Sequence, residues 1–387
     1  MSQGNWNYPT SMTVGAGCIK HVTLACHELK IQSPLLVTDP GLVDLPMVKS
    51  VIYDCQQAKL NIAVFSQVQS NPTEENIVDG ISAYNDGKHD GVIALGGGSS
   101  IDTAKAIALV AKQNCSLWDF ADIGDNWRRA NGRLIAPVIA IPTTAGTGSE
   151  VGRASVITDP VHQVKTIIFH PQMLPAKVLL DPNVTVRLPP DITAATGMDA
   201  LSHNLEAFCS PSYHPMADGI AIEGIRLIKD YLPVAFHNGC DIEARTQMLV
   251  ASSMGATAFQ KGLGGMHAIA HTLGALYNKH HGLLNAILMP YIMTANRSQI
   301  EHKMAHLGRY LALPQPDFNG VLHWILDLRA ELGIPHTLTD IGIDDDQAER
   351  IGKMSVADAA AGGNPICFNA QQYADIFTNA IQGTLIA

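Results

Sequence analysis

Short hydrophobic runs alternate with helical patterns along the first half of the chain. Most of these runs are uninterrupted stretches of Val, Ile, Leu and Ala rather than alternating ones, which is typical of strands buried on both faces of a parallel sheet. The runs are PLLVTD, NIAVFS, DGVIALGGGSS, APVIAIPTT and AKVLLDP. Because helical patterns separate them, the pattern predicts an α/β fold with a parallel sheet covered by helices.

The pattern changes after VTVRLPPDI, where Pro189, Pro190 and Asp191 indicate a boundary and the start of a helix. Beyond this point the chain shows long helical patterns, and no strand-like run of comparable quality returns. We therefore predict two domains, an α/β domain over residues 1–185 and an all-helical domain over residues 186–387.

Composition and charge narrow the function classes. The chain has 387 residues, of which 47% are hydrophobic and 16% charged, which suits a compact enzyme. Its net charge of −10 and the lack of a basic run argue against nucleic acid or an anionic membrane as a partner. The seven cysteines are scattered without a C-x-x-C pair, which predicts a reducing, cytoplasmic location and no cysteine-ligated zinc. No signal peptide is expected at the N-terminus, and the apolar runs are too short to span a bilayer.

A glycine-rich turn joins a predicted strand to a helix in VIALGGGSSIDTAKAIALV. Gly96, Gly97 and Gly98 allow a ligand to approach the backbone closely. Ser99 and Asp102 follow at the start of the helix, where free N–H groups and the helix dipole favour a phosphate. A tight turn with an N-cap serine explains the same residues equally well, because the motif is neither G-x-G-x-x-G nor a Walker sequence.

A second turn of this kind, IPTTAGTGSEVG, again follows an apolar run. Two such turns at strand ends suggest a ligand with two phosphates, and hence a dinucleotide at the carboxyl edge of the sheet. Asp39, at the end of another strand, can accept hydrogen bonds from ribose hydroxyls and would repel a 2′-phosphate. The more common role for such a residue is that of a turn aspartate before Pro40 and Gly41.

Pairs of polar residues four positions apart recur in the helical half. His267 and His271 form one pair and Asp199 and His203 another, and each pair shares one face of a helix. The segment NKHHG adds two more histidines. One carboxylate and three imidazoles suit a divalent first-row cation with one position left open. A lone pair of this kind is more often structural, but the two pairs together favour a metal site.

These motifs together resemble those of the iron-dependent, or group III, alcohol dehydrogenases, in that family's order and over nearly the whole chain. The stretches that carry the resemblance are GAGCIK, VTDPGL, GVIALGGGSSIDTAKAIAL, IPTTAGTGSEV, LPPDITAATGMDALSHNLEAF and MHAIAHTLGALYNKHHGLLNAILMPYIM. The resemblance implies a Rossmann-like dinucleotide-binding domain followed by an all-helical metal-binding domain. It implies NAD-linked, metal-dependent interconversion of a small alcohol, primary or otherwise, and its aldehyde or ketone in the cleft between the domains of a homo-oligomer.

The resemblance also implies roles for individual residues. The metal ligands would be Asp199, His203, His267 and His281, holding Fe²⁺ or alternatively Zn²⁺, and His271 would be a catalytic histidine that does not bind the metal. The implied cofactor-binding residues are Asp39 at the ribose; Asn71, Gly96, Gly97, Gly98, Ser99 and Asp102 along the cofactor cleft; and Thr143, Thr144, Thr147, Ser149 and Lys165 toward the pyrophosphate and nicotinamide.

Three departures from the family's usual pattern lie within the motifs, and we expect them to alter the shape of the substrate pocket. They are Gly152 and Ala154 after GSEV, Asn204 after His203, and Lys279–His280. The identity of the alcohol therefore stays open.

Two other functions compete with a dehydrogenase. A lyase of the dehydroquinate-synthase type shares the fold, a metal and NAD. Its phosphate- and carboxylate-bearing substrate would require several Lys and Arg residues near the metal, and the segments around Asp199 and His267 carry almost none. A non-catalytic metal- or nucleotide-binding scaffold would not need both a nicotinamide site and an open metal position.

Overall fold

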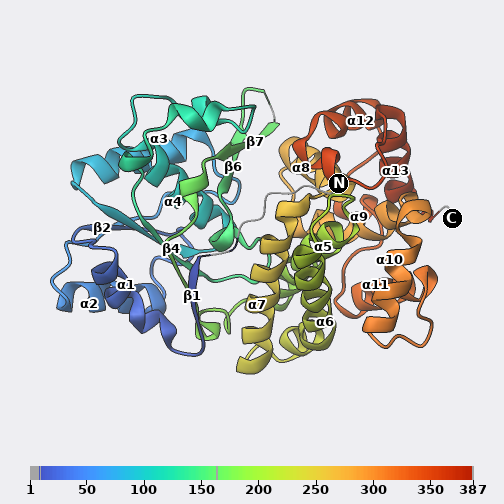
Figure 1. Cartoon of the computed structure of the whole chain (residues 1–387), viewed down its shortest axis with the longest axis horizontal. Coiled ribbons are helices and arrows are strands. Elements are labelled where there is room, and N and C mark those ends of the chain that lie inside the picture. Colours follow the sequence, from blue (N-terminus) through green and yellow to red (C-terminus); the bar gives the residue numbers. More distant parts are fainter. Residues whose placement is uncertain (1–7, 9, 163, 386–387) are drawn as a thin grey trace. The chain divides into compact units, whose positions relative to one another are not determined.

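The computed structural model describes Tyr8, residues 10–162 and residues 164–385, and these form two compact units (Figure 1). One unit spans Tyr8–Arg187 and the other begins at Leu188. The N-terminal segment in which no signal peptide is expected lies largely outside the described residues. Among the helices that are described, none combines the length and the apolar character needed to cross a membrane.

The first unit is built on a parallel sheet of six strands in the order β1-β8-β5-β4-β2-β3. Every neighbouring pair runs parallel, and β2, β4 and β5 are buried throughout, as the uninterrupted apolar runs predict. The strands are β1 (Ser11–Val14), β2 (Pro34–Val37), β3 (Ala63–Phe65), β4 (Gly91–Gly96), β5 (Val138–Pro142) and β8 (Lys177–Leu180). The predicted α/β class is therefore confirmed, with β1 as an edge strand that the sequence pattern did not indicate.

The direction in which strands are added to the sheet reverses between β2 and β4. The chain passes from β2 outward to β3 and then returns to the other side of β2 to add β4, β5 and β8. In open parallel sheets, ligands bind outside the carboxyl ends of the strands at such a switch point. Asp39, after β2, and the turn that begins at Gly96, after β4, lie at this edge.

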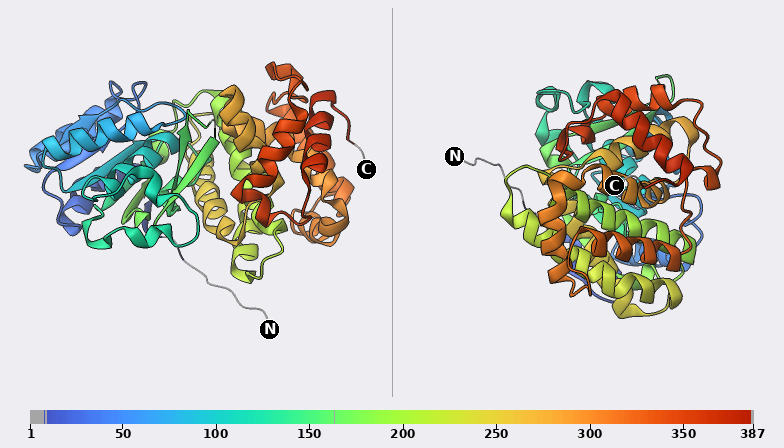
Figure 2. Two further views of the ribbon diagram at one scale, coloured as in Figure 1. Left: turned by 90° about the horizontal axis from the view of Figure 1, so that it is seen from above. Right: turned by 90° about the vertical axis from the view of Figure 1, so that its right-hand side faces the viewer.

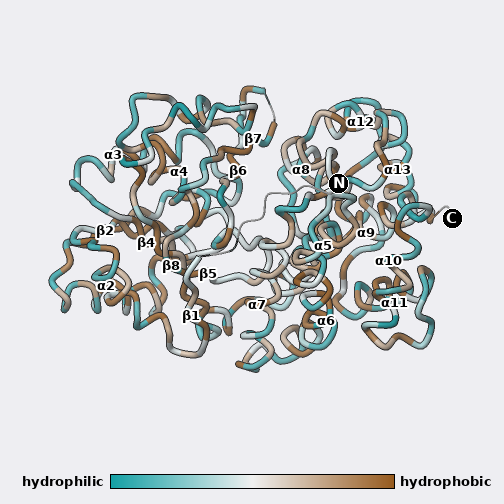
Figure 3. Tube along the Cα trace, viewed as in Figure 1, coloured by the Kyte–Doolittle hydropathy of each residue, from teal (hydrophilic) through white to brown (hydrophobic). Residues whose placement is uncertain are grey.

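Helices cover the two faces of the sheet (Figures 1 and 3). The helices α1 (Val22–Glu28) and α2 (Pro46–Gln57) pack on one face, where Val22, Val48 and Val51 join apolar residues of the central strands in one buried cluster. The other two, α3 (Glu74–Asp86) and α4 (Gly98–Val110), pack against each other, and α4 also packs on β4. This double cover explains why the central strands β2, β4 and β5 have no polar face.

An antiparallel hairpin of β6 (Ala154–Asp159) and β7 (Val164–Phe169) accompanies the sheet. The sequence pattern did not indicate this hairpin, because its strands are only half-buried and follow the second glycine-rich turn directly. The hairpin packs on α4 through β6, so it lies beside the helix whose N-terminus faces the carboxyl edge of the sheet.

The described residues of the second unit contain helices and connecting loops but no strand, which confirms the predicted all-α class (Figure 2). Its helices are α5 (Pro190–Cys209), α6 (Pro215–His237), α7 (Ile242–Ala258), α8 (Gly265–Tyr277), α9 (His281–Ala295), α10 (Arg297–Tyr310), α11 (Phe318–Glu331), α12 (Ala348–Ala357) and α13 (Ala370–Gln382). The first of these, α5, begins at the predicted proline pair and is buried at every position from Thr193 to Cys209. It packs against α6, α7 and α9 and therefore forms the centre of the unit.

Asn204, one of the departures from the family pattern, lies within the packing of α5, α6 and α7. Its Nδ2 donates hydrogen bonds to the carbonyl oxygens of Ala200 at 2.8 Å and Ala251 at 3.1 Å. A Cβ on Gly224 of α6 would lie 2.2 Å from its Oδ1, and one on Gly255 of α7 would lie 2.6 Å from its Nδ2. These contacts place the Asn204 side chain in the packing between helices rather than in a pocket. Gly224 and Gly255 leave room for it there.

Substitution of Gly224 by alanine tests this packing. In the otherwise unchanged protein, Gly224→Ala should lower the free energy of unfolding by about 1–3 kcal/mol, because the added methyl group overlaps the Asn204 amide. In an Asn204→Ala background the same change should be neutral, or stabilising by up to about 1 kcal/mol, because alanine favours a helix over glycine. Denaturant unfolding of the four proteins measures the coupling. Equal effects in both backgrounds would show that the two residues do not pack together.

Candidate metal centre and cofactor turns

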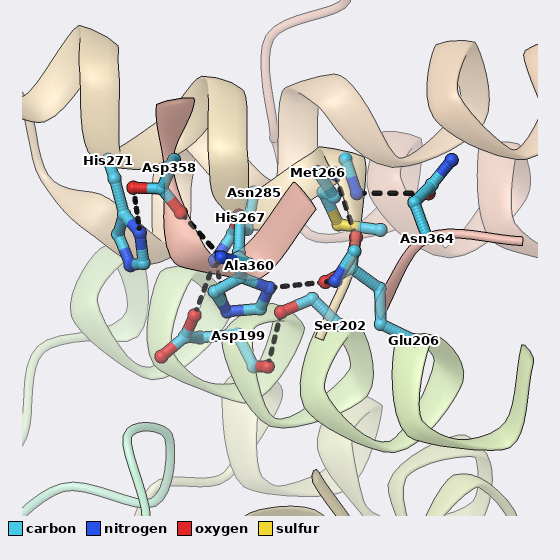
Figure 4. Close-up of polar contacts among 12 residues, drawn as sticks. Asp199, Ser202, Glu206, Met266, His267, His271, Asn285, Asp358, Ala360 and Asn364 are labelled. Atoms are coloured by element: carbon cyan, nitrogen blue, oxygen red, sulfur yellow. Dashed lines mark hydrogen bonds and ion pairs between the residues drawn. The ribbon is translucent and has the colours of Figure 1, made fainter. Parts of the chain in front are cut away.

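Helices of the second unit bring the four predicted metal ligands together, and Figure 4 shows two of them, Asp199 and His267. Asp199 and His203 lie one turn apart on α5, and His267 lies on α8. One potential ligand atom from each of these three residues lies within 4.8 Å of the other two, and all three residues are buried. His281, the first residue of α9, places its Nε2 3.7 Å from Oδ1 of Asp199.

The imidazole rings of this group stack on one another. The rings of His203 and His267 are nearly parallel, with centroids 4.7 Å apart, and those of His271 and His281 are similarly stacked at 5.2 Å. Burial, reinforced by the neighbouring His203, holds the pKa of His267 well below its usual range. His267 is therefore a neutral imidazole at neutral pH, which is the form that binds a metal ion.

Asn285, one turn after His281 on α9, lies among the predicted ligand atoms and is fully buried. Its Nδ2 is 2.9 Å from Oδ1 of Asp199, 3.1 Å from Nε2 of His267 and 3.2 Å from Nε2 of His281. Three of the four predicted ligand atoms thus converge on one electropositive N–H group. A carboxylate and imidazoles arranged in this way form a donor set that fits a divalent cation.

Glu206 also belongs to this group, although the sequence analysis did not single it out. It follows Asp199 by seven residues and His203 by three, so the three side chains share one face of α5. One carboxylate oxygen, Oε2, lies 2.7 Å from Nδ1 of His267 (Figure 4), and the carboxylate also accepts two backbone hydrogen bonds from the start of α8. Burial raises the pKa of Glu206 to about 7. Asp199, His203 and Glu206 stand at positions i, i+4 and i+7, and this helical spacing is the sequence signal that could have identified Glu206.

His271 is paired with an acidic residue that is remote in sequence. Its Nδ1 lies 3.0 Å from Oδ2 of Asp358, whose Oδ1 accepts a hydrogen bond from the Ala360 N–H at 2.8 Å. Burial acts to raise the pKa of Asp358, but His271, the Ala360 N–H and His267 together outweigh it, so the pKa lies below its usual range. A carboxylate at Nδ1 favours the tautomer with its proton on that nitrogen, so Nε2 of His271 keeps its lone pair.

In the first unit, the two glycine-rich turns lie against each other at the carboxyl ends of β4 and β5. The Thr143 N–H donates to the carbonyl oxygen of Gly96 at 3.0 Å. A Cβ on Gly98 would lie 2.6 Å from the Thr147 side chain, so only glycine allows this approach. Because α4 begins at Gly98, its free N–H groups, including that of Ser99, stand at the edge where an anion would bind.

Several predicted cofactor residues contact one another. Ser149 donates a hydrogen bond to the carboxylate of Asp102, which also accepts the Val156 N–H at 3.0 Å and pairs with the buried ammonium of Lys105 at 3.2 Å. These bonds join α4 to the second turn and to β6. Asp102, itself one of the predicted cofactor residues, therefore stabilises the two turns by contacts within the protein.

The remaining predicted cofactor residues lie around the same edge of the sheet. Nζ of Lys165, on β7, donates to Oδ1 of Asn71 at 2.9 Å. Oδ1 of Asp39 accepts the Gly41 N–H at 2.9 Å, so one carboxylate oxygen takes part in the turn. The other oxygen, Oδ2, lies 3.6 Å from where a Cβ on Gly96 would be. The side chain of Thr144 lies beside Gly97.

Comparison with known proteins identifies the family. Residues 9–182 match the family described as iron-containing alcohol dehydrogenase, and residues 193–381 match the C-terminal region of the same family. The chain belongs to the iron-containing alcohol dehydrogenases. The resemblance inferred from the sequence motifs is therefore confirmed.

Characterised relatives match over almost the full length. The chain is 36% identical over 376 residues to 4-hydroxybutyrate dehydrogenase of Cupriavidus necator, covering 95% of this chain and 97% of that protein. It is 33% identical over 387 residues to NAD-dependent methanol dehydrogenase of Bacillus methanolicus, covering 97% and 100%. The crystal structure of a 1,3-propanediol oxidoreductase superposes with a TM-score of 0.92 at 32% identity, covering 98% of this chain and 100% of that one.

Removal of one imidazole tests the metal centre. His267→Ala should lose most of its bound metal after dialysis, because it removes a buried donor from the convergent set. His280→Asn is the matched control: His280 precedes His281 and caps α9 by accepting the Leu283 N–H, a bond that asparagine can also accept. Metal per chain, measured by elemental analysis of iron-loaded protein, should fall only in the first variant. Equal metal content in both variants would exclude His267 as a ligand.

Proposed function

We propose that this chain is a metal-dependent, NAD-linked alcohol dehydrogenase that interconverts a small, primary or other, alcohol and its aldehyde or ketone. The observation that carries the proposal is the convergence of Asp199, His203, His267 and His281 in a protein whose other unit carries two dinucleotide-type turns. The names of its relatives, dehydrogenases of 4-hydroxybutyrate, methanol and 1,3-propanediol, support an alcohol as substrate without specifying which one.

The residues present would divide the work of hydride transfer. A divalent cation held by Asp199, His203, His267 and His281 would supply Lewis-acid chemistry that makes the alcohol hydroxyl more acidic. The glycine-rich turns and the N-terminus of α4 would bind the pyrophosphate and so position the nicotinamide to accept the hydride. No covalent nucleophile is required for this reaction.

His271 is the proposed proton acceptor. It stacks on His281 without being needed as a ligand, because four protein ligands already leave only the position that an alcohol oxygen would occupy. With its proton on Nδ1 held by Asp358, the Nε2 lone pair can accept the hydroxyl proton. The alternative is that His271 only orients its neighbours.

Iron is the proposed metal because the chain belongs to the iron-containing alcohol dehydrogenases, and zinc is the alternative. We further propose a cytoplasmic location, supported by seven cysteines without a disulfide among the described residues. A homo-oligomer is proposed as well, because β1 is an edge strand of the described sheet with all four residues exposed, and an exposed edge can pair with another chain. Neither nucleic acid nor membrane is expected as a partner.

The lyase alternative fits these helices less well. A phosphate- and carboxylate-bearing substrate needs cationic side chains beside the metal, and neither α5 nor α8 contains a lysine or arginine. The two functions are separated by absorbance of NADH in iron-loaded protein given NAD and a panel of alcohols that includes methanol, 1,3-propanediol and 4-hydroxybutyrate. A dehydrogenase forms NADH steadily with at least one alcohol. Absence of NADH formation with every alcohol, and of consumption with the matching aldehydes, would refute the proposal.

Cofactor choice should depend on Asp39. Its carboxylate at the switch point between β2 and β4 would repel a 2′-phosphate, so the protein should prefer NAD to NADP. Asp39→Gly should narrow that preference, measured as the ratio of kcat/KM values for the two cofactors. Asp44→Gly is the control, since it removes an equal charge from the following loop, where Asp44 pairs with Lys49 at the surface. An NADP preference in the wild type, or a ratio unmoved by Asp39→Gly, would place the ribose elsewhere.

The role of His271 can be separated from that of a ligand. His271→Gln should retain the metal but lower kcat by about 10²-fold, the usual minimum effect of losing a general acid–base group. Asp358→Asn should act in the same direction, because it removes the carboxylate that holds Nδ1. Kinetics and metal content are measured on the same preparations. Metal loss as large as in His267→Ala would make His271 a ligand, and a near-normal kcat would leave it a structural role.

A further inference from the structure

One carboxylate joins two of the helices that carry the predicted metal ligands. Glu206 of α5 is 6% exposed, and its side chain reaches the first residues of α8. Its Oε2 accepts the Gly264 N–H at 2.7 Å and lies 2.7 Å from Nδ1 of His267, while its Oε1 accepts the Met266 N–H at 2.7 Å. A buried carboxylate is costly unless such bonds satisfy it. These three hydrogen bonds use both carboxylate oxygens of Glu206, and all of them join it to the N-terminal end of α8.

We propose that Glu206 is a positioning residue of the metal centre that acts through His267, an inference that rests on the metal site of the proposed function. Each carboxylate oxygen of Glu206 accepts a backbone N–H, and these bonds favour its ionised form. A carboxylate cannot donate, so Nδ1 of His267 carries the proton in this contact. The lone pair is then on Nε2, which is the nitrogen that faces Asp199 and Asn285 in the ligand group. Glu206 therefore selects the only tautomer of His267 that can bind a cation at that place.

Charge balance gives the carboxylate a second effect on the same site. A divalent cation held by Asp199 and three neutral imidazoles would carry one more positive charge than these four side chains compensate. Glu206 supplies a second negative charge one imidazole ring away from the cation. A carboxylate behind a metal-binding histidine also makes that histidine a stronger ligand.

A purely structural role for Glu206 is distinguishable, because a second side chain caps the same helix end. Oδ1 of Asn364 accepts the Gly265 N–H at 3.0 Å (Figure 4) but has no contact with His267 among the described hydrogen bonds. Both side chains approach closely because glycine stands at the helix start: a Cβ on Gly264 would lie 2.9 Å from Glu206 and 3.0 Å from Asn364. Asn364 is thus a matched control that shares the capping role and lacks the contact with the ligand.

The test compares Glu206→Gln with Asn364→Ala in metal affinity. The dissociation constant for Zn²⁺ is measured on metal-stripped full-length protein, by competition with a chromophoric chelator. Glu206→Gln should raise it by about 10–100-fold, the usual effect of losing a carboxylate behind a ligand histidine. Asn364→Ala should weaken the helix end without such a change. An unchanged affinity in Glu206→Gln, or an equal loss in both variants, would overturn the inference.

A second measurement does not require the variant to fold. Nitrogen-15 NMR of the histidine rings in metal-free wild-type protein should show His267 protonated on Nδ1, with Nε2 unprotonated. Protonation on Nε2 would overturn the inference directly. Neither readout depends on turnover, so the two proposals can fail separately: a protein that oxidises alcohols with NAD but binds Zn²⁺ equally well as Glu206→Gln contradicts only the role of Glu206.

Discussion

The structure depends on the burial of a polar cluster inside an otherwise apolar bundle of helices. Asp199 and Glu206 are carboxylates on a helix that is buried along almost its whole length, and burial of an unpaired carboxylate costs several kcal/mol. Imidazole, amide and backbone N–H groups of α8 and α9 satisfy these carboxylates at hydrogen-bond distance. The positions of α5, α8 and α9 are therefore fixed by polar contacts as well as by packing, and the same contacts direct the ligand atoms toward one point.

In the α/β unit, glycine residues allow two turns to approach each other closely. These turns must approach each other and still leave backbone N–H groups available at the sheet edge, which a side chain on Gly98 would prevent. Asp102 joins the turns through its hydrogen bond with Ser149 and its ion pair with the buried Lys105. Because these contacts lie inside the protein, they leave the outer side of the turns available to a ligand. The reversal of strand order between β2 and β4 places Asp39 beside these turns. Rigid support and an open backbone edge are what the binding of a dinucleotide requires.

The spacing of apolar and polar residues along the chain predicted much of the fold. It did not predict features that depend on contacts between residues far apart in the sequence. Five strands and the start of α5 followed from apolar runs and a proline pair. A spacing of four predicted the pairs Asp199–His203 and His267–His271, and three of these four side chains come together in the structure. The partner of His271 did not follow from such a spacing, because Asp358 lies 87 residues away in an irregular segment that has no period. Asn204 was expected to affect the pocket, yet Gly224 and Gly255 place it in the helix packing. Which side of a buried helix a residue faces depends on its neighbours in space.

Side chains of α5, α8 and α9 are proposed to hold one cation through a carboxylate and three imidazoles. X-ray absorption spectroscopy of the iron-loaded protein tests this most directly, because it reports the atoms around the metal whatever the substrate is. The account predicts a shell of nitrogen and oxygen only, with the outer-shell scattering of imidazole rings. A sulfur neighbour, or a shell without imidazole scattering, would contradict it.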